Sequence, residues 1–408
     1  MRERPLTGIR VLDLTNVLAG PYCSYQLMLL GAEVVKIETP GRGDLARHLG
    51  TDPALNEAGI GASFLAQNGG KRSVEFNLKD SDDRATFAEL VRVADVLVEN
   101  FRPGVLARLG FGWPQLQELN PSLIYCAISG FGQTGPLSQM PAYDQVIQGM
   151  SGMMSITGTE QTVPQRVGFP VCDTVGGLTA ALAIVAAIAG RRNDPAGCFL
   201  DVSMLEASVS AMGWPVSNYL TTGVVPRPMG DQNATAAPSG TVGTADGPLN
   251  IAANQQQQFE TLCHVVGRPD LLADARFADR ERRLLHREEL NRELNTALAA
   301  RPAVEWEGLL AAAGVPAARI LSVPESVDLD QLAYRDFFAT LPFPSSADSA
   351  ALRVSGNGFL VDGQRMHPTE PPPILGQHNG ELPELLLRWK AASEPAAAGA
   401  GDPAEVAP

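Results

Sequence analysis

The first half of the chain alternates short runs of branched and apolar residues with longer segments of helical spacing. Strands are predicted at 9–14, 32–38, 73–77, 96–98 and 123–128, and helices at 22–30 and 79–92. Because strands that alternate with helices form parallel sheets, the pattern predicts an α/β fold with a parallel sheet. The residues expected in its core are Ile9, Val11, Val34, Val35, Val96 and Leu97.

The pattern changes after residue 220. Residues 221–247 are rich in Gly, Pro, Thr and Ala, and they are too numerous for an idle connector. Beyond them a strand is predicted at 250–253, and amphipathic helices at 256–266, 283–300 and 303–314. The predicted organisation is a large domain that begins with 1–220 and resumes at 326–390, a smaller α/β domain at 225–325, and a disordered tail at 391–408.

Residues 166–190 (RVGFPVCDTVGGLTAALAIVAAIAG) place one carboxylate, Asp173, at the start of a nearly uncharged helix. Asp is a preferred helix N-cap, and the positive end of a helix favours its ionised form. Since the helix is apolar on nearly every side, we expect it to be buried, with Asp173 ionised at the edge of the core. Local sequence alone favours a cap without further role, so a chemical role needs support from elsewhere in the chain.

Composition and charge exclude several classes of function. The net charge of −14 argues against a nucleic-acid partner. The 5 cysteines form no CxxC pair and the 5 histidines are scattered, which argues against a disulfide framework and a metal site. No secretory signal is visible, and the apolar stretch Leu178–Gly190 is shorter than the ~20 residues that span a bilayer. A cytoplasmic protein that binds neither metal nor membrane is expected.

Basic and amide side chains recur after successive predicted strands. They are Lys36 and Arg42, Lys71 and Arg72, and Asn100, Arg102 and Arg108. Because ligands of α/β sheets bind outside the carboxyl ends of the strands, these side chains are expected to form a cradle for anions. Taken one at a time, each is more simply explained as a solvated surface charge.

Other kinds of chemistry find little support. The pattern is Rossmann-like, but no GxGxxG follows the first strand, and neither a P-loop nor a GxSxG elbow is present. Cys172 has no neighbouring His to lower its pKa, which favours a buried structural thiol. Tyr143 lies in the loop PAYDQ, where its hydroxyl either holds a carbonyl or thioester oxygen or is simply satisfied within the protein.

Seven segments, in order, carry a family resemblance. They are GIRVLDLTNVLAGPY, GAEVVKIETPGRGD, NGGKRSVEFNLK, ADVLVENFRPGVLARLG, the SGFGQTGP and AYD run, GFPVCDTVGGL and PPPILGQHNGELPELL. Over residues 5–388 the chain resembles the class III coenzyme A transferases, the group that contains formyl-CoA transferase and several dicarboxylate CoA transferases.

The resemblance implies a mechanism, a fold and a set of substrates. Asp173 matches the family's covalent nucleophile, which attacks an acyl-CoA thioester, and Asn100 and Arg108 match positions of its CoA site. Added on charge alone, for the pyrophosphate and 3′-phosphate, are Lys36, Arg42, Lys71 and Arg72. The family fold is a Rossmann-like large domain with a smaller domain, in a homodimer of interlocked chains. An acyl-CoA and a carboxylic acid are the substrates, and no tightly bound cofactor is implied.

Departures from the family pattern bear on the substrate. Leu18 stands where formyl-CoA transferase has Gln, and GDQNATAAPSG at 230–240 replaces a run of glycines that closes over the site. Both departures argue against a formyl or oxalate preference. NQQQQF at 254–259 and the region of Tyr143 are more similar to the dicarboxylate transferases that use succinyl-CoA. A C4–C6 dicarboxylate acceptor is expected, with Arg47 or Arg166 at its distal carboxylate and Tyr143 helping to position it.

Three alternatives stay open. Racemases of 2-methylacyl-CoA share this fold but use a His in the loop that here carries Tyr143, and a tyrosine of ordinary pKa, ~10, is a poor base at neutral pH. A non-catalytic CoA-binding subunit would have no need of Asp173 at the mouth of the helix. A nicotinamide oxidoreductase is disfavoured by the missing glycine motif.

Overall fold

The computed structural model describes residues 3–344 and 351–393 and separates the chain into two compact units. Unit 1 comprises the residues up to 153, residues 167–217 and the residues from 331 onward, and unit 2 comprises 154–166 and 218–330. Residues 154–166, which the sequence places in the large domain, thus belong to unit 2. The predicted tail starts inside the last helix, which ends at Ser393, and its residues 394–408 lie outside the described residues.

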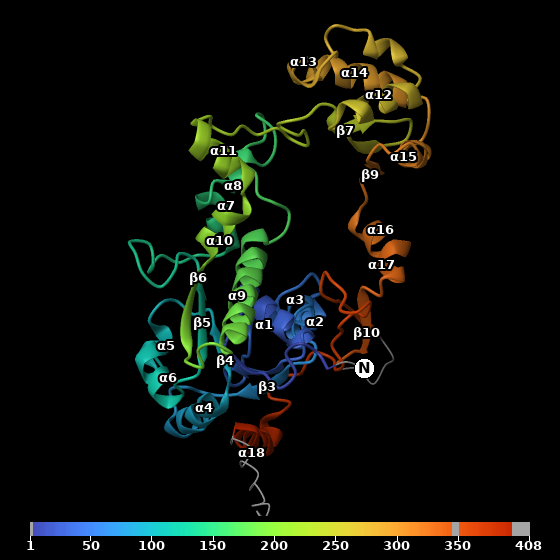
Figure 1. Ribbon diagram of the computed structural model, residues 1–408. Helices are drawn as coiled ribbons and strands as arrows, with labels where there is room; N and C mark the ends of the chain where they lie inside the picture. The colour runs from blue at the N-terminus through green and yellow to red at the C-terminus, as the bar shows by residue number, and fades with distance from the viewer. Residues whose placement is uncertain (1–2, 345–350, 394–408) are drawn as a thin grey trace, which may run out of the picture. The chain divides into compact units, whose positions relative to one another are not determined.

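A six-stranded parallel sheet forms the centre of the described part of unit 1 (Figure 1). Its strands are β1 (Arg10–Asp13), β2 (Glu33–Glu38), β3 (Arg72–Glu75), β4 (Val96–Glu99), β5 (Ile124–Ser129) and β6 (Cys198–Ser203). The strand order is β3-β2-β1-β4-β5-β6, so the winding of the chain reverses between β1 and β4. Val11 of β1 lies opposite Val34 of β2 and Val96 of β4. The predicted parallel α/β sheet is confirmed.

Helices cover both faces of this sheet. The helices that lie wholly in unit 1 are α1 (Ala19–Leu29), η1 (Leu45–His48), α2 (Pro53–Glu57), α3 (Ala62–Leu65), α4 (Ser81–Val93), α5 (Val105–Arg108), α6 (Trp113–Leu119), α7 (Asp144–Met150), α9 (Val171–Gly190), α10 (Met204–Ala211), η3 (Asn379–Glu381) and α18 (Leu382–Ser393). Because side chains alternate along a strand, Val11 and Val34 pack into the layer of α1 and α9, while Leu12 and Val35 pack into that of α4 and α18. Burial on both faces explains why the strands read as continuous apolar runs.

The structure corrects some predicted boundaries. Gly20 and Pro21 read as a break in the sequence, but they lie in the first turn of α1, where the N–H that Pro lacks has no helical acceptor. The helix predicted at 283–300 is two helices, α13 (Arg280–Leu285) and α14 (Arg287–Leu298). Ile9 is half-buried ahead of β1, whereas the other predicted core residues are buried.

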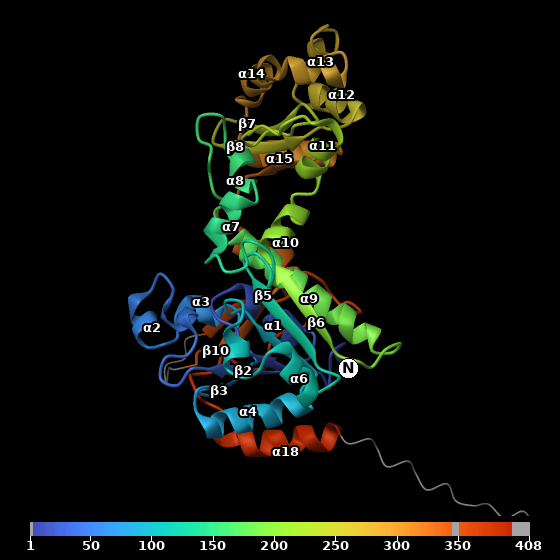
Figure 2. The same cartoon turned by 90° about the vertical axis from the view of Figure 1, so that its left-hand side faces the viewer.

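Helix α9 is longer than the apolar stretch considered above. It runs for 20 residues and is the one helix of the described chain that is long and apolar enough to cross a membrane, which corrects the expectation based on Leu178–Gly190. In this structure it packs against α1, α10, β5 and β6 (Figure 2). Gly177 permits the close approach to α1, because a Cβ atom there would lie 2.4 Å from the carbonyl oxygen of Ala19. The amino ends of α1 and α9 therefore lie near each other.

Unit 2 is built on a three-stranded antiparallel sheet. Its strands are β7 (Ser239–Gly243), β8 (Pro248–Ala252) and β9 (Ala317–Arg319), in that order. Its other helices are α12 (Gln256–Val265), η2 (Pro269–Leu272), α15 (Ala303–Ala312) and α16 (Val323–Val327), while α8 (Met153–Ile156), α11 (Trp214–Thr222) and α17 (Asp330–Tyr334) straddle the unit boundaries. Phe259, Leu294 and Trp306 are buried in a core that belongs to unit 2 alone.

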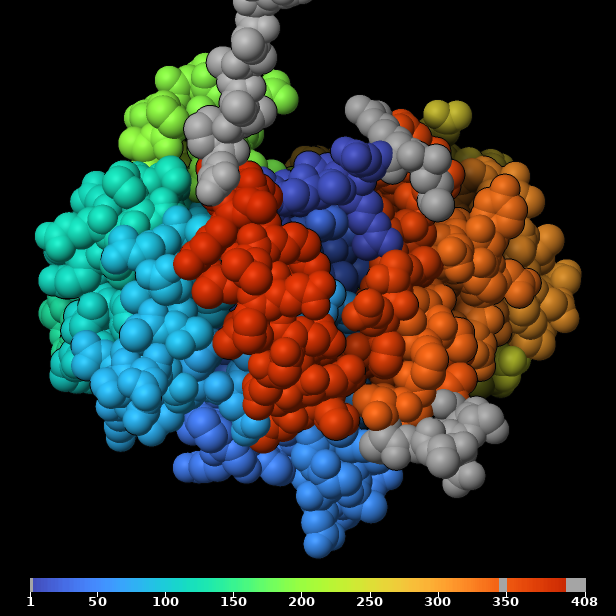
Figure 3. Space-filling model, turned by 90° about the horizontal axis from the view of Figure 1, so that it is seen from below, coloured from blue at the N-terminus to red at the C-terminus, as the bar shows by residue number. Residues whose placement is uncertain are grey.

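The C-terminal segment closes the β3 edge of the sheet. Strands β10 (Phe338–Pro342) and β11 (Ala351–Ser355) pair antiparallel. The Ser73 N–H then donates to Nδ1 of His378 (3.0 Å), and the Glu75 N–H donates to Oδ1 of Asn379 (2.8 Å). Helix α18 lies along α4 (Figure 3). The QHN part of the last sequence motif thus satisfies backbone groups that an edge strand would leave open.

Candidate active site

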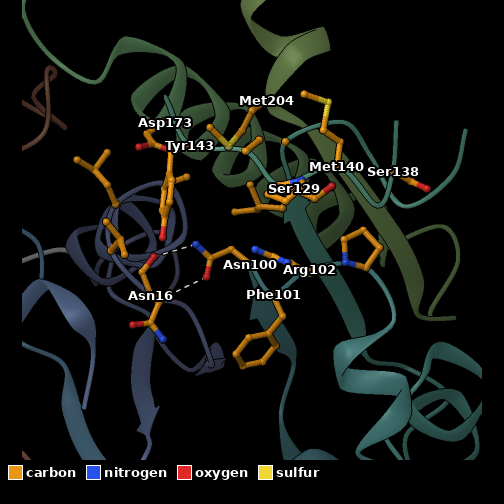
Figure 4. Close-up of a pocket in the computed structure, with 18 of the residues that line it drawn as sticks. Asn16, Asn100, Phe101, Arg102, Ser129, Ser138, Met140, Tyr143, Asp173 and Met204 are labelled. Atoms are coloured by element: carbon orange, nitrogen blue, oxygen red, sulfur yellow. Dashed lines mark hydrogen bonds between the residues drawn. The ribbon is translucent and has the colours of Figure 1, made fainter. Parts of the chain in front are cut away.

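A cavity of about 330 Å³ opens in unit 1 at the carboxyl ends of β1, β4 and β5 (Figure 4). Its lining includes Asn16 after β1, Asn100 after β4, Ser129 at the end of β5, and Tyr143 and Asp173. The winding of the sheet reverses between β1 and β4, and open α/β sheets bind their ligands at such a switch point. The cavity is therefore the candidate site.

Asn100 ties together the loops that follow β1 and β4. Its Nδ2 donates to the Asn16 carbonyl oxygen, and its Oδ1 accepts from the Asn16 N–H, both at 2.8 Å (Figure 4). The neighbouring Val17 has φ of 68°, a conformation that a β-branched residue rarely adopts. Its N–H donates to Oδ1 of the buried Asp44 at 2.9 Å. Strain of this kind persists where the surrounding structure enforces it, which is common at functional sites.

Asp173 is not the N-cap of α9 but the third residue of the helix. The N-cap is Pro170, and the cap bonds come from Asp144 of α7, whose Oδ1 accepts from the N–H groups of Cys172 (2.8 Å) and Asp173 (3.3 Å). Oδ2 of Asp144 accepts from Gln148 (2.6 Å). Because Asp144 takes over the capping role, the carboxylate of Asp173 is left to face the cavity.

The protonation of Asp173 also differs from the expectation. Burial, together with the nearby Asp144, raises the pKa of Asp173 from its ordinary 3.8 to about 7. Desolvation and the like charge raise this pKa by more than the amino end of the helix lowers it, although the helix end by itself would favour the ionised form. Asp173 is therefore a carboxyl group that exchanges its proton near neutral pH, as expected of a group in a chemical role.

Three of the basic residues proposed above are buried in ion pairs and do not line the cavity. Lys36 pairs with Asp44 (2.9 Å), Lys71 pairs with Asp13 (3.0 Å), and Arg47 pairs with Glu38 (2.6 Å). Each of these three cations is at most 1% exposed. The structure contradicts their assignment to CoA phosphates and, for Arg47, to a distal carboxylate.

These ion pairs support the loop that lines the cavity. Lys36 also donates to the Thr15 carbonyl oxygen (2.8 Å), and Lys71 to that of Pro21 (3.0 Å). Burial raises the pKa of Asp13, but the attraction of Lys36 and Lys71 outweighs it, so that pKa lies below its ordinary value. The buried charges therefore stay paired and hold the chain on both sides of Val17.

The remaining predicted residues lie nearer the surface. Arg72 pairs with Glu381 at 2.5 Å, which ties it to the C-terminal segment rather than to a ligand. Arg42 and Arg108 are exposed, and neither side chain has a hydrogen-bond or ion-pair partner among residues 3–344 and 351–393. Arg166 is exposed and belongs to unit 2. Tyr143 lines the cavity and is 70% exposed.

Sequence reasoning missed several residues of the site. The sequence pattern singles out Asp144 only as the neighbour of Tyr143 and Arg102 only as one member of a basic cluster, and it gives Ser129 and Phe101 no role. The ENFRPG and AISGFG segments follow β4 and β5 directly, so their place after a strand was the signal that could have found them. Phe101 also lines a second cavity of about 270 Å³, with Ile37, Asn77 and Lys79.

Chemically, the site offers one carboxyl group in a mostly apolar cavity. Among the described residues, no group of His, Cys, Asp and Glu side chains is arranged to hold a metal ion. The amino end of α1 reaches the same cavity through Ala19: Leu18 gives no side-chain cap, and the Ala19 N–H has no acceptor within the described residues. An unused backbone donor in the same cavity as a carboxylate suits the attack of an oxygen nucleophile on a carbonyl group.

Comparisons with known proteins agree with this chemistry. The model of CoA-transferase family III matches residues 6–379. The acetyl-CoA:oxalate CoA-transferase of Acetobacter aceti is 40% identical over 360 residues, which cover 88% of this chain and 90% of that enzyme. The succinyl-CoA:glutarate CoA-transferase of Mus musculus is 34% identical, over 95% of this chain and 87% of that enzyme.

Solved structures agree as well. The crystal structure of a CAIB/BAIF family protein from Brucella suis superposes with a TM-score of 0.82 at 30% identity, over 94% of this chain and 100% of that one. The resemblance noted in the sequence is thereby confirmed. The chain belongs to CoA-transferase family III and is an enzyme that transfers CoA between acyl-CoA thioesters and carboxylic acids.

Proposed function

We propose that this enzyme moves CoA from succinyl-CoA to a dicarboxylate through a covalent intermediate on Asp173. The observation that carries the proposal is the place of Asp173: it is the one carboxylate among the described residues that line the cavity at the switch point of the sheet. Oxalate and glutarate, in the names of the two relatives, are both dicarboxylates, which supports that class of acceptor. The same two names give different CoA donors, acetyl-CoA for one relative and succinyl-CoA for the other, so the donor of this enzyme needs a separate test.

The proposed reaction has four steps. A carboxylate oxygen of Asp173 attacks the thioester carbonyl carbon, the C–S bond breaks, and CoA thiolate leaves a mixed anhydride on Asp173. The thiolate then attacks the aspartyl carbonyl and releases the donor acid. The acceptor carboxylate attacks the aspartyl thioester and frees the thiolate again. Finally the thiolate attacks the acceptor carbonyl, which gives the new acyl-CoA and restores Asp173. Each difficult exchange is thus divided into easier ones.

The site supplies what these steps need. The free N–H group of Ala19 and the positive end of α1 can stabilise the oxyanion that forms at each attack. An anhydride hydrolyses in water, and the apolar walls, such as Ile128 and Met204, limit the water that reaches Asp173. Because attack needs the ionised carboxylate, the raised pKa of Asp173 ties the first step to pH.

CoA itself would extend from Asp173 past Phe101. Phe101 lines both the cavity of Asp173 and the second cavity described above, which combines apolar walls with Lys79 and Asn77. A chain as long as pantetheine can therefore connect the reacting centre to an anion-binding end. Arg42 and Arg108, which are exposed, remain the proposed contacts of the CoA phosphates. Asn100 stabilises the cavity wall between these arginines and Asp173.

Within the described part of the chain, the cavity lacks the histidine base that the related racemases use. The described residues that line the cavity include no histidine, and Tyr143 occupies the loop position concerned. The transferase reading therefore needs no second catalytic residue, whereas a racemase would have to move an α-proton with Asp173 alone.

We also propose a homodimer, with chains interlocked as in the family. In a single copy of unit 1, the outer face of α9 leaves Leu178 (46%) and Leu182 (71%) exposed, and Trp214 is 80% exposed. Large apolar side chains on one face mark a surface that another protein covers. A second copy of this chain is the simplest partner.

The transferase proposal is tested by replacing Asp173. Asp173→Ala should lower CoA transfer from succinyl-CoA to glutarate by on the order of 1,000-fold or more, because the covalent route is lost. Circular dichroism should show an unchanged fold, since Asp144 and not Asp173 caps α9. A mass-spectrometric screen of CoA products, with succinyl-CoA and acetyl-CoA against mono- and dicarboxylates, identifies donor and acceptor. Full transfer activity in Asp173→Ala would contradict the mechanism.

A further inference from the structure

Two polar side chains of the first cavity have no role in the steps above. Ser129, at the end of β5, is 8% exposed, and its Oγ atom is buried without a hydrogen-bond partner in the described residues. Arg102 is the only cationic side chain among the described lining residues. No ion pair or hydrogen bond of its guanidinium is found within 3–344 and 351–393.

We propose that Arg102 and Ser129 bind the second carboxylate of a dicarboxylate substrate, the one that does not react. The proposal rests on the transferase function, with Asp173 as the group that the first carboxylate must approach. A guanidinium offers planar paired donors that match a carboxylate, and a serine hydroxyl adds a third donor. The three groups come from different strand ends of one cavity: Arg102 follows β4, Ser129 ends β5, and Asp173 enters from α9 (Figure 4).

The rest of the cavity makes such a pair necessary for a dicarboxylate. Its wall is largely apolar, with Leu18, Phe101 and Met140 among the lining residues. A carboxylate placed against such a wall without a partner would pay a large cost of desolvation. Conversely, a buried hydroxyl without a partner is itself unfavourable, and a bound carboxylate supplies the acceptor that Ser129 lacks. One ligand group therefore satisfies both side chains.

The same two residues replace the earlier candidates for this role. Arg47 is held by Glu38 through two short bonds and does not line the cavity. Arg166 belongs to unit 2. A rival use for Arg102 is contact with a CoA phosphate, which would act on every acyl-CoA and carboxylic acid alike. The two uses thus differ in what they do to selectivity between acceptors.

The test is a competition between two acceptors. Glutarate and pentanoate, which carries a methyl group in place of the second carboxylate, are mixed in equal amounts with one CoA donor. The ratio of glutaryl-CoA to pentanoyl-CoA is then measured by mass spectrometry. Because both products form from the same donor in one tube, effects on the donor cancel. Arg102→Gln should lower the ratio about 10- to 100-fold, and Ser129→Ala about 3- to 10-fold, the range expected for hydrogen bonds to a charged group.

The control is Arg108→Gln, in the same segment of the chain. It should raise the KM for the donor and leave the product ratio within about a factor of two of the wild type. If Arg102→Gln also slows both acceptors equally, with a raised donor KM, Arg102 binds CoA and the subsite is refuted. An unchanged product ratio in Ser129→Ala would show that Ser129 is not part of the subsite. Failure of the transferase mechanism looks different, since it would show as product formation by Asp173→Ala.

Discussion

At the scale of single residues, the protonation of Asp173 decides how the site works. A helix end alone would keep this carboxylate ionised, but burial and Asp144 raise its pKa to about 7. The same carboxylate that resists ionisation is a stronger nucleophile once ionised and only weakly solvated. Asp144 therefore has two effects: it fixes the start of α9, and it makes the attack dependent on pH.

The first prediction concerns this pH dependence. The kcat/KM for the acyl-CoA should rise with pH through a midpoint near 7, because only the ionised Asp173 attacks. In Asp144→Asn the like charge is gone while an oxygen still caps α9, so the midpoint should fall by about half a unit or more. Burial remains, and the midpoint should stay above the ordinary 3.8. A pH profile with the same midpoint in both proteins would contradict the role of Asp144.

A second prediction concerns Glu99, which lies buried behind the cavity wall. It accepts from the Phe101 N–H (2.5 Å) and from the Tyr125 hydroxyl (2.9 Å), yet burial raises its pKa from 4.5 to about 7. Since the folded pKa is raised, stability is lost as pH rises from about 4 to about 8, by up to about 3 kcal/mol. Glu99→Gln should flatten this dependence, as measured by urea unfolding at several pH values, and an equally steep loss in the variant would contradict it.

The residues of the site differ in how far their positions could be predicted from the sequence. Local patterns of apolar and capping residues predict the end of a strand near Asn100 and the helix that carries Asp173. The partners of Lys36, Lys71 and Arg47 do not, because Asp44, Asp13 and Glu38 come beside them only once the strand order is set. In the same way, the cap that Asp144 gives to α9 joins residues 28 apart, which no local pattern reveals.

At the scale of elements, the approach of α9 to α1 brings Asp173, the proposed nucleophile, and the free N–H group of Ala19 to one cavity. Gly177 permits this approach. A Cβ atom placed on its neighbour Gly176 would lie 3.0 Å from the side chain of Met204. The GG pair in the DTVGGL motif is therefore explained by helix packing. Gly177 thus lets α9 approach α1, and Gly176 lets it approach α10.

Gly177→Ala should accordingly push the two helices apart. A Cβ atom 2.4 Å from the Ala19 carbonyl oxygen cannot be accommodated without a backbone shift, and we expect a loss of about 1–3 kcal/mol in stability together with lower kcat. Gly190→Ala is the matched control at the far end of α9, where nothing lies within 4 Å, and it should be neutral or stabilising by about 0.5–1 kcal/mol. Thermal unfolding and steady-state rates compare the two, and equal behaviour would refute the packing argument.

At the scale of the whole molecule, the apolar outer face of α9 is the surface that the proposed homodimer would cover. Leu182→Glu costs a single copy little, because that side chain is 71% exposed, but it places a charge in the proposed interface. Interlocked chains can separate only by unfolding, so both proteins are unfolded and refolded first. Sedimentation velocity should then show a dimer for the wild type and more monomer for the variant. Gln117→Glu, at an exposed position of α6, adds the same charge elsewhere and should leave the dimer intact. A monomeric wild type would contradict the proposal.

The covalent intermediate on Asp173 is the central claim, and one measurement tests it most directly. The enzyme is incubated with succinyl-CoA, treated with hydroxylamine to trap an activated carboxyl group as a hydroxamate, and digested with trypsin. Cleavage after Arg166 and Arg191 releases a peptide in which Asp173 is the only acidic residue, so a hydroxamate there has one possible site. The account predicts this hydroxamate only when acyl-CoA is present. An unmodified peptide from an enzyme that is turning over, or a hydroxamate on another acidic residue, would contradict it.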